Sequence, residues 1–437
     1  MPSDHSNILI VGAGIFGTSA AYHLSLTHAD PSSITVIDRS PFPPHQAAST
    51  DINKIVRADY TTPFYMDLAY EAMHAWKTWP ILQSKDGQRF FHQSGWVMLS
   101  DAGSDLAERI RTNLRARGSD LTSDVEIDGG IRERWGGLLK DTRFDDPKIE
   151  KGYWNPEAGW ADAGDAVTKM LEEAVGRGVK YECGDVQSLL MGENGVKGVQ
   201  TKDGRVYEAD QILLATGAWT SQLLSEVEGI LNIKDRDTIG KQVMAAGVCV
   251  VHYKLDDEEY ERLKDMPVIV YGDRGEVLPP PSGSRLLKFT NARSFTNTAR
   301  TTDRHRISIP PEAQQTVVSS PLQSETLDCI VSKTMPSFAA RDPAYWRLCW
   351  DAITPTQDQL ITRHPHPRLG NLNIAVGGSF HSWKFLPIIG KYVVNVLNGI
   401  SNGEEKDGRW AWKDGTTHGR GAHEKVVPKR ELNELET

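Results

Sequence analysis

Two cationic side chains stand three positions apart in a segment near the N-terminus. Lys54 and Arg57 lie within residues 51–60, which read D-I-N-K-I-V-R-A-D-Y. A helical turn over this segment would place both side chains on one face, and an arginine can clamp a carboxylate with two hydrogen bonds. The pair could therefore hold an anionic substrate. The spacing alone favours the simpler alternative of two solvated basic residues.

The glycines near the N-terminus have the pattern of a phosphate-binding turn. Gly12, Gly14 and Gly17 form G-x-G-x-x-G directly after the apolar run Ile8–Val11, and a helical pattern follows over residues 18–26. This is the strand–turn–helix context that the motif requires. The first glycine permits a tight turn, the second lets backbone approach a pyrophosphate, and the third lets the helix pack against the strand. The N–H groups at the helix start favour a phosphate.

A second strand and an acid complete this unit. Residues 34–37 form a β-type run that ends at Asp38, about 20 residues beyond the third glycine, where an acid binds a ribose hydroxyl. An ordinary glycine turn is the alternative, and the strand, the helix and the acid together argue against it. The unit therefore predicts a dinucleotide cofactor, which is either FAD or NAD(P).

Further elements are predicted around this unit. The patterns indicate helices over residues 63–79 and 388–397, and buried strands over residues 211–219 and Leu372–Val376. Residues 290–315 are polar and are predicted to form an irregular loop.

Composition narrows the class of protein. The chain has 437 residues, of which 39% are hydrophobic and 24% charged, with a net charge of −9. This predicts a globular enzyme with two or three domains, and it argues against a nucleic-acid partner. No apolar run reaches membrane length. The first strand leaves no room for a signal peptide, and residues 433–437 are no peroxisomal signal, so a cytoplasmic location is expected.

The cysteines show no pairing pattern. Cys183, Cys249, Cys329 and Cys349 are scattered without C-x-x-C spacing, which argues against a disulfide framework and a zinc site and fits a reducing compartment. The ordinary expectation for such a cysteine is a small buried packing residue.

Five motifs together resemble a known family. They are GAGIFG at 12–17, DINKIVRADY at 51–60, LLATGAW at 213–219, RLCWDAITP at 347–355 and GGSFHSWKF at 377–385. Over nearly the whole chain, the sequence is similar to the FAD-dependent amine oxidases typified by monomeric sarcosine oxidase. It is most similar to the fungal fructosyl amino acid oxidases (amadoriases) and to saccharopine oxidase. The motifs are specific for the superfamily and much less specific for the substrate.

The resemblance implies an α/β fold of the glutathione-reductase type, similar to that of sarcosine oxidase. A Rossmann-like FAD-binding domain is expected from residues 1–90, 151–230 and 341–437. A smaller α+β substrate domain with a mixed sheet is expected from residues 91–150 and 231–340. The resemblance also implies a monomer, with a small amino acid and O2 as its partners.

The resemblance assigns the cofactor site as well. In this family a cysteine in the RLCW position forms a thioether to FAD, so Cys349 is the candidate for covalent attachment, and no metal is expected. The cofactor-binding residues implied by the motifs are Gly12, Ala13, Gly14, Ile15, Phe16, Gly17, Asp38, Arg39, Ser49, Lys54, Val186, Gly217, Trp219, Cys349, Gly378, Phe380, His381 and Lys384.

Two lysines are the catalytic candidates. Lys288 matches a family lysine that activates dioxygen, and a fixed cation would stabilise the superoxide that forms when oxygen takes its first electron. Lys54 would tune the flavin or the oxygen site. The alternative for Lys288 is an exposed strand position, and the apolar residues around it argue against that.

The substrate residues also follow from the resemblance. Arg57 and Lys384 match the pair that grips the substrate carboxylate in sarcosine oxidase, with Tyr60 beside them. Arg420 resembles a tail arginine of the fructosyl enzymes. Those enzymes carry a sugar-binding glutamate where this chain has Leu278. That acid is either lost or replaced by Glu276 in a shifted register.

The predicted activity is oxidation of a secondary-amine amino acid to an imine, with O2 reduced to H2O2, most like fructosyl amino acid oxidase. The alternatives within the family are a saccharopine, sarcosine or pipecolate-type oxidase, or a biosynthetic amine oxidase. A flavin dehydrogenase that does not use O2 and a non-catalytic dinucleotide-binding protein are alternatives of a different class.

Overall fold

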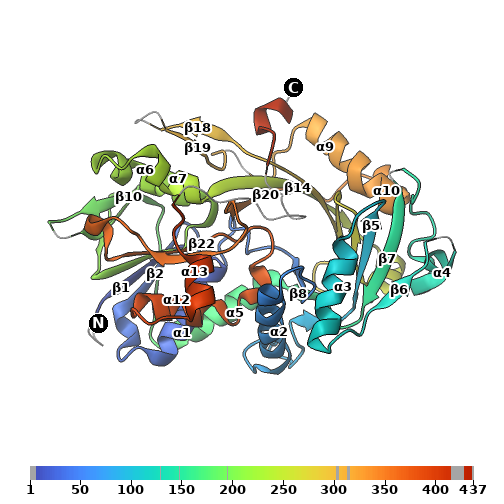
Figure 1. Ribbon diagram of the computed structural model, residues 1–437, viewed down its shortest axis with the longest axis horizontal. Helices are drawn as coiled ribbons and strands as arrows, with labels where there is room; N and C mark the ends of the chain where they lie inside the picture. Colours follow the sequence, from blue (N-terminus) through green and yellow to red (C-terminus); the bar gives the residue numbers. More distant parts are fainter. Residues whose placement is uncertain are drawn as a thin grey trace.

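The computed structural model describes residues 6–127, 129–146, 148–193, 195–301, 305–312, 315–414 and 428–435. The chain forms an α/β structure in which a six-stranded sheet and an eight-stranded sheet lie side by side (Figure 1). Within the described ranges, no helix is long and apolar enough to cross a membrane.

The six-stranded sheet contains the glycine motif. Its central strand β1 (Ile8–Val11) is fully buried and lies parallel to its two neighbours, and the edge strand β21 is antiparallel to the strand beside it. The order of the strands across the sheet is β21 (Leu360–Arg363), β22 (Leu372–Val376), β13 (Gln211–Leu214), β1, β2 (Ile34–Asp38) and β9 (Lys180–Cys183).

Helices cover this sheet. The helix after the glycine turn, α1 (Ile15–Thr27), is buried on nearly all sides because it packs between the sheet and the helices α5 and α12. The other helices are α2 (Pro63–Thr78), α3 (Leu106–Arg117), α4 (Gly130–Gly137), α5 (Ala163–Gly176), α6 (Thr220–Ile230), α7 (Ile239–Gln242), α8 (Asp257–Leu263), α9 (Ser320–Thr326), α10 (Ser332–Thr334), α11 (Pro336–Ala339), α12 (Ile389–Leu397) and α13 (Glu404–Trp410).

The eight-stranded sheet is mixed. Most of its neighbouring strands are antiparallel, and β15 and β5 are parallel. Its order is β20 (Tyr345–Ile353), β14 (Met244–Lys254), β17 (Leu286–Phe295), β16 (Gly275–Leu278), β15 (Val268–Tyr271), β5 (Trp96–Asp101), β7 (Ile149–Asn155) and β6 (Ser123–Val125). The expected α/β fold with a Rossmann-like sheet and a second, mixed sheet is confirmed.

The predicted domain boundaries run through this second sheet. The segment 341–437 includes β20, which pairs along its whole length with β14, and the boundary at residue 151 falls inside β7. Strand pairing therefore places β20 and β7 in the eight-stranded sheet, because each has its backbone partners there. The rest of the division into two domains stays a prediction.

Three small sheets complete the fold. One joins β3 (Asn53–Val56), β8 (Gly159–Asp162) and β4 (Phe91–His92), and another joins β10 (Val186–Met191), β11 (Val196–Thr201) and β12 (Val206–Glu208). The third pairs β18 (Thr298–Arg300) with β19 (Arg306–Ser308). The prediction of an irregular loop over 290–315 is therefore wrong, since this range contains the end of β17 and a hairpin.

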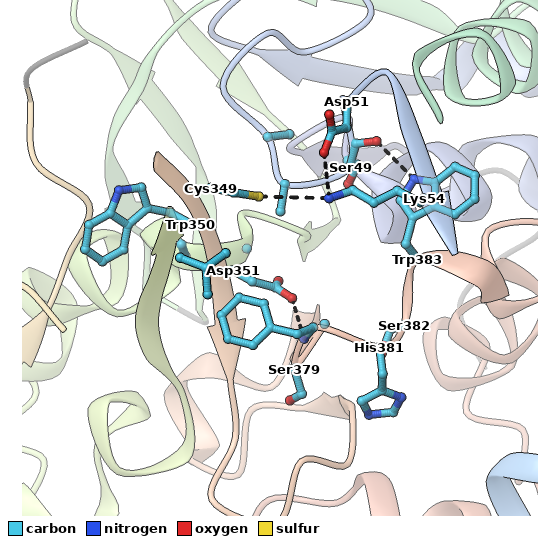
Figure 2. A pocket seen from close by; sticks show the side chains of 18 of the residues that line it. Ser49, Asp51, Lys54, Cys349, Trp350, Asp351, Ser379, His381, Ser382 and Trp383 are labelled. Atoms are coloured by element: carbon cyan, nitrogen blue, oxygen red, sulfur yellow. Dashed lines mark hydrogen bonds and ion pairs between the residues drawn. The ribbon is translucent and has the colours of Figure 1, made fainter. Parts of the chain in front are cut away.

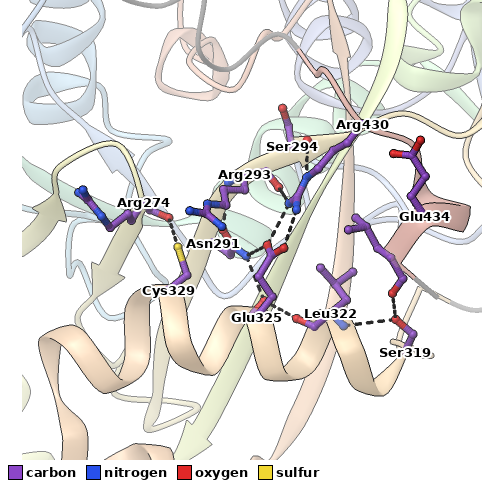
Figure 3. A network of polar contacts seen from close by, with 12 residues as sticks. Arg274, Asn291, Arg293, Ser294, Ser319, Leu322, Glu325, Cys329, Arg430 and Glu434 are labelled. Atoms are coloured by element: carbon purple, nitrogen blue, oxygen red, sulfur yellow. Dashed lines mark hydrogen bonds and ion pairs between the residues drawn. The ribbon is translucent and has the colours of Figure 1, made fainter. Parts of the chain in front are cut away.

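A segment close to the C-terminus packs on the end of β17 (Figure 3). The Arg430 guanidinium donates to both carboxylate oxygens of Glu325, at 2.5 and 3.0 Å, and to the backbone carbonyl of Arg293 at 2.8 Å. Glu325 also accepts a hydrogen bond from Asn291 on β17 at 2.9 Å. These contacts join α9, β17 and the terminal segment.

Candidate active site

A large cavity of about 1540 Å³ lies between the two sheets. It is larger than the ~300–1,000 Å³ of ordinary small-molecule pockets. Its walls come from the glycine turn, from residues 44–60, from the ends of β2 and β13, from β14, β17 and β20, and from residues 377–384.

The glycine turn forms one end of this cavity. Gly12 has φ +100°, and a Cβ there would lie 2.5 Å from the carbonyl oxygen of Ala215. A Cβ on Gly17 would lie 1.8 Å from the carbonyl oxygen of Gly12, so only glycine lets α1 approach β1 this closely. Gly14, Ile15 and Phe16 line the cavity, so the positive end of the α1 dipole opens into it.

The predicted ribose acid lies beside this turn. Asp38 lines the cavity and accepts a hydrogen bond from the Ala13 N–H at 2.9 Å. Burial raises the pKa of its carboxyl, and this hydrogen bond opposes the rise. Ala13 is fully buried and Gly17 packs against Gly12, so these two residues shape the turn without lining the cavity.

Beside the glycine turn, predicted cofactor-binding residues from separate segments line the cavity. The Arg39 guanidinium lies 4.4 Å from the centre of the Trp219 ring. Val186 and Gly217 line the wall near them, and the Ser49 hydroxyl accepts a hydrogen bond from the Ile15 N–H at 2.9 Å. This end of the cavity thus has a planar cation, an aromatic face and a helix N-terminus, which suit an adenosine diphosphate group.

The loop after β22 forms another part of the cavity wall. The carboxylate of Asp351 accepts a hydrogen bond from the Phe380 N–H at 2.8 Å, and a Cβ on Gly378 would lie 2.4 Å from the same carboxylate. Phe380 has a positive φ of 58°. Gly378, Phe380 and His381 all line the cavity, held there by this tight turn.

Cys349 lies on β20 at the cavity wall. It is only 4% exposed and packs against Ala48 and Phe380. Figure 2 shows the Lys54 ammonium between the Asp51 carboxylate and the Cys349 sulfur, with 4.0 Å between Nζ and Sγ. The cysteine sulfur therefore lies at the cavity wall with a cation beside it.

Lys288 lies on β17, where it lines the same cavity. Its ammonium donates to the Asp51 carboxylate at 2.6 Å and to the Asn53 carbonyl at 3.0 Å. Burial lowers the pKa of Lys288, and Asp51 opposes this. Burial would also lower the pKa of Lys54, but Cys349 and Asp51 outweigh burial and raise it.

The two predicted substrate cations, Arg57 and Lys384, both line the cavity and both contact Tyr60. The Arg57 guanidinium donates to the Asp59 carbonyl and lies 4.8 Å from the centre of the Trp96 ring and 5.1 Å from that of Tyr60. The Lys384 ammonium donates to the Tyr60 hydroxyl at 2.9 Å. Burial, followed by repulsion from Arg57, holds the pKa of Lys384 well below its usual value.

Three expectations need correction or lie beyond the described residues. Lys54 lies on β3 and Arg57 directly follows it, so no helical turn brings them together; pairing with β8 makes this segment a strand. Cys183 is exposed, unlike the other three cysteines, because it ends the edge strand β9. Arg420 lies outside the described residues.

Several residues of the site were not predicted from the sequence. Asp51 binds both lysines, and the Trp383 indole donates to the Ser49 carbonyl at 3.0 Å. Arg347 donates to the carbonyl oxygens of Thr50 and Ala47. An acid three positions before Lys54 was the available signal for Asp51. No local signal pairs Arg347 with a loop that far away in the sequence.

The glycine turn, the acid at the end of β2 and the long cavity define a dinucleotide-binding oxidoreductase. The match to a family description, FAD dependent oxidoreductase (DAO), covers residues 7–396. The chain therefore belongs to this family of FAD-dependent oxidoreductases and is an enzyme. The donors around the cavity fit FAD, because they offer a helix N-terminus for the phosphates and an acid for the ribose.

Known relatives narrow the class to oxidases of amino acids and amines. L-saccharopine oxidase of Schizosaccharomyces pombe is 30% identical over 430 residues, which cover 93% of each chain. An amino acid oxidase of Aspergillus fumigatus is 27% identical and covers 90% of this chain and 92% of its own. The crystal structure of the deglycating fructosamine oxidase Amadoriase II of Aspergillus fumigatus superposes with a TM-score of 0.78 at 27% identity, covering 96% and 94% of the two chains. The predicted resemblance is confirmed.

Proposed function

We propose that the protein oxidises the C–N bond of a secondary-amine amino acid to an imine and reduces O2 to H2O2. The observation that carries this proposal is the pair of cations, Arg57 and Lys384, in the cavity that fits FAD. FAD held in this cavity would supply the electron acceptor for the amine and the donor for oxygen. Water then hydrolyses the imine.

Arg57 and Lys384 would hold the substrate carboxylate. Arg57 is fixed by the Asp59 carbonyl and by two aromatic faces, so its guanidinium is positioned before the substrate arrives. Burial and repulsion from Arg57 lower the pKa of Lys384, and within the described ranges no carboxylate anion lies within ion-pair distance of its ammonium. A substrate carboxylate supplies that anion, so binding would raise the pKa and fix the charge.

Cys349 and Lys288 would serve the cofactor and oxygen. Cys349 is the proposed point of covalent attachment, with the Lys54 ammonium 4.0 Å from its sulfur. Lys288 offers a fixed cation at the cavity wall for the anion that forms on oxygen. The similarity to monomeric sarcosine oxidase supports action as a monomer.

The choice of amino acid depends on the strand β16. Leu278 is buried and pairs in register with Lys288, so no acid stands there. Glu276 also lines the cavity, and its charge partly opposes the low pKa of Lys384. A fructosyl amino acid remains the leading substrate class. The 30% identity to L-saccharopine oxidase favours an N-substituted diamino acid of the saccharopine type as the second candidate.

A substrate panel with peroxide readout tests the proposal. The panel contains fructosyl-valine, fructosyl-lysine, saccharopine, sarcosine and pipecolate, and the expected result is H2O2 from at least one of them. If Glu276 contacts the N-substituent of the accepted substrate, Glu276→Gln should weaken the binding of that substrate. Bleaching of the flavin without peroxide would identify a dehydrogenase, and no bleaching with any N-substituted amino acid would exclude the proposed activity.

A further inference from the structure

One buried carboxylate joins two lysines at the cavity wall. The same Oδ2 atom of Asp51 lies 2.6 Å from the Lys288 ammonium and 3.1 Å from the Lys54 ammonium. The side chains of Asp51 and Lys288 are 2% and 3% exposed, so water does not screen their attraction. Lys54 comes from β3 and Lys288 from β17, so Asp51 connects a small sheet to the eight-stranded sheet.

The charged groups around this carboxylate are few. Within the described ranges, Asp51 is the only carboxylate within ion-pair distance of either lysine. His252 lies on β14, where it pairs in register with Lys288 of β17. Its Nε2 atom is 3.9 Å from Oδ1 of Asp51, and its ring stacks on Tyr345. The other charged or titratable groups that face Lys288 and Asp51 are Lys54, Cys349 and Arg347.

Burial makes Lys288 depend on this carboxylate. Desolvation lowers the pKa of Lys288. The Asp51 carboxylate raises this pKa, whereas the nearby Lys54 ammonium lowers it further. Desolvation also lowers the pKa of His252, so the imidazole is not a substitute cation. The Asn53 carbonyl is the other partner of the Lys288 ammonium. Without Asp51, two ammonium groups would therefore face each other in a buried space.

We propose that Asp51 is a positioning residue that holds the ammonium groups of Lys288 and Lys54 side by side at the wall of the cavity. It acts through the two lysines and takes no part in bond making or breaking. Lys54 in turn faces Cys349, so one carboxylate positions both the cation near the attachment cysteine and the cation for oxygen. The role of Lys288 toward oxygen rests on the proposed function, whereas the pairing itself does not.

A double-mutant cycle on thermal unfolding tests the pairing without any substrate. Asp51→Asn should lower the Tm clearly in the wild-type background, because it leaves the buried Lys288 ammonium without its anion. In the Lys288→Met background that ammonium is absent, so the same substitution should lower the Tm much less. The control is Asp358→Asn, a buried carboxylate that accepts from Tyr65 at 2.8 Å. Its effect should be equal in both backgrounds.

Two outcomes of this cycle would overturn the proposal. One is an equal loss of Tm from Asp51→Asn in both backgrounds. The other concerns the case in which Asp51→Asn alone yields no folded protein. The double variant with Lys288→Met should then fold. If the double variant does not fold although Lys288→Met alone does, the pairing is contradicted.

The pH dependence of flavin reoxidation tests the positioning. Lys288 is cationic below its pKa, so reoxidation slows as the pH rises through that pKa. Asp51→Asn should move this midpoint to lower pH and slow reoxidation by about 10- to 100-fold, with anaerobic reduction by substrate little changed. Asp51→Glu, which keeps the charge, should restore the midpoint. An unchanged midpoint in Asp51→Asn would refute the role, even if the protein proves to be an oxidase.

Discussion

The buried lysines Lys288 and Lys384 and the partly buried Lys54 line the cavity, and they differ in how their charge is balanced. Lys54 and Lys288 share the Asp51 carboxylate. In the described part of the chain, no carboxylate lies within ion-pair distance of Lys384, which donates to the Tyr60 hydroxyl and to the His381 carbonyl at 2.5 Å. A buried cation without an anion is costly, which suits a residue whose anion arrives with the substrate.

Kinetics can distinguish the proposed role of Lys288 toward oxygen from the proposed role of Arg57 and Lys384 toward the substrate. Lys288→Met should slow reoxidation of the reduced flavin by about 10²- to 10³-fold, because a fixed cation stabilises the anion that forms on oxygen. Anaerobic reduction by substrate should change little, as stopped-flow spectroscopy would show. Equal losses in both half-reactions would indicate that Lys288 is structural or binds substrate.

The carboxylate clamp makes a different prediction. Arg57→Ala or Lys384→Ala should each lower kcat/KM for the amino acid at least tenfold, since loss of a buried charged hydrogen bond costs about 2 to 5 kcal/mol and ~1.4 kcal/mol is a factor of ten. The matched control is the decarboxylated amine, a poor substrate of the wild type that should lose little more in either variant. Wild-type kinetics in both variants would contradict the clamp.

Covalent attachment is tested by precipitation in acid. With the thioether to Cys349 in place, the yellow colour should stay with the precipitated protein, because acid unfolds the chain without breaking a C–S bond. Cys349→Ala should release all flavin to the supernatant. Complete release from the wild type would rule out the attachment.

At the scale of elements, the close packing of α12 on α1 supports the glycine turn. A Cβ on Gly390 would lie 2.1 Å from the carbonyl oxygen of Ser19. Gly390→Ala should therefore destabilise the protein by about 1–3 kcal/mol, measured as a lower Tm together with weaker retention of flavin. The control is Gly176→Ala on α5, where no atom lies within 4 Å of the added Cβ.

The expected effect of the control is small and of opposite sign. Alanine is favoured over glycine in a helix by up to about 1 kcal/mol, so Gly176→Ala should leave the Tm unchanged or raise it. If Gly390→Ala has the same small effect, the contact between α1 and α12 is not as close as the structure places it.

Elements were predicted best where the sequence pattern is local. The strand, turn and helix around Gly12 and the helix α2 (Pro63–Thr78) follow from apolar spacing alone. The β18–β19 hairpin was missed because its polar strands are held by distant partners, with Thr298 bonded to Glu431. The spacing of Lys54 and Arg57 could not decide whether they share a face, because it says nothing of the strand β8 that pairs with β3.

At the scale of the whole molecule, the site exists because distant segments meet between two sheets. Motifs carried by the resemblance indicated Cys349, Lys288 and Lys384 as partners of one site, and all three line the cavity. The sequence could not show that Asp51 lies between Lys54 and Lys288, since that contact depends on how β3 docks against the larger sheet.

The similarity to known relatives also predicts the oligomeric state. Because the chain is similar to monomeric sarcosine oxidase, activity is expected to need no second subunit. Light scattering coupled to gel filtration should give the mass of one 437-residue chain. Specific activity should also be independent of protein concentration, and activity confined to a dimer fraction would disprove this.

The central claim is that this flavoprotein takes electrons from an N-substituted amino acid and gives them to oxygen. The most direct measurement mixes the yellow protein with such a substrate without oxygen, and then admits air. We expect the flavin to bleach in the first step and to regain its colour in the second, with one H2O2 formed for each reduced flavin. A flavin that stays yellow with every N-substituted amino acid, or that regains its colour only with an artificial acceptor and without peroxide, would contradict it.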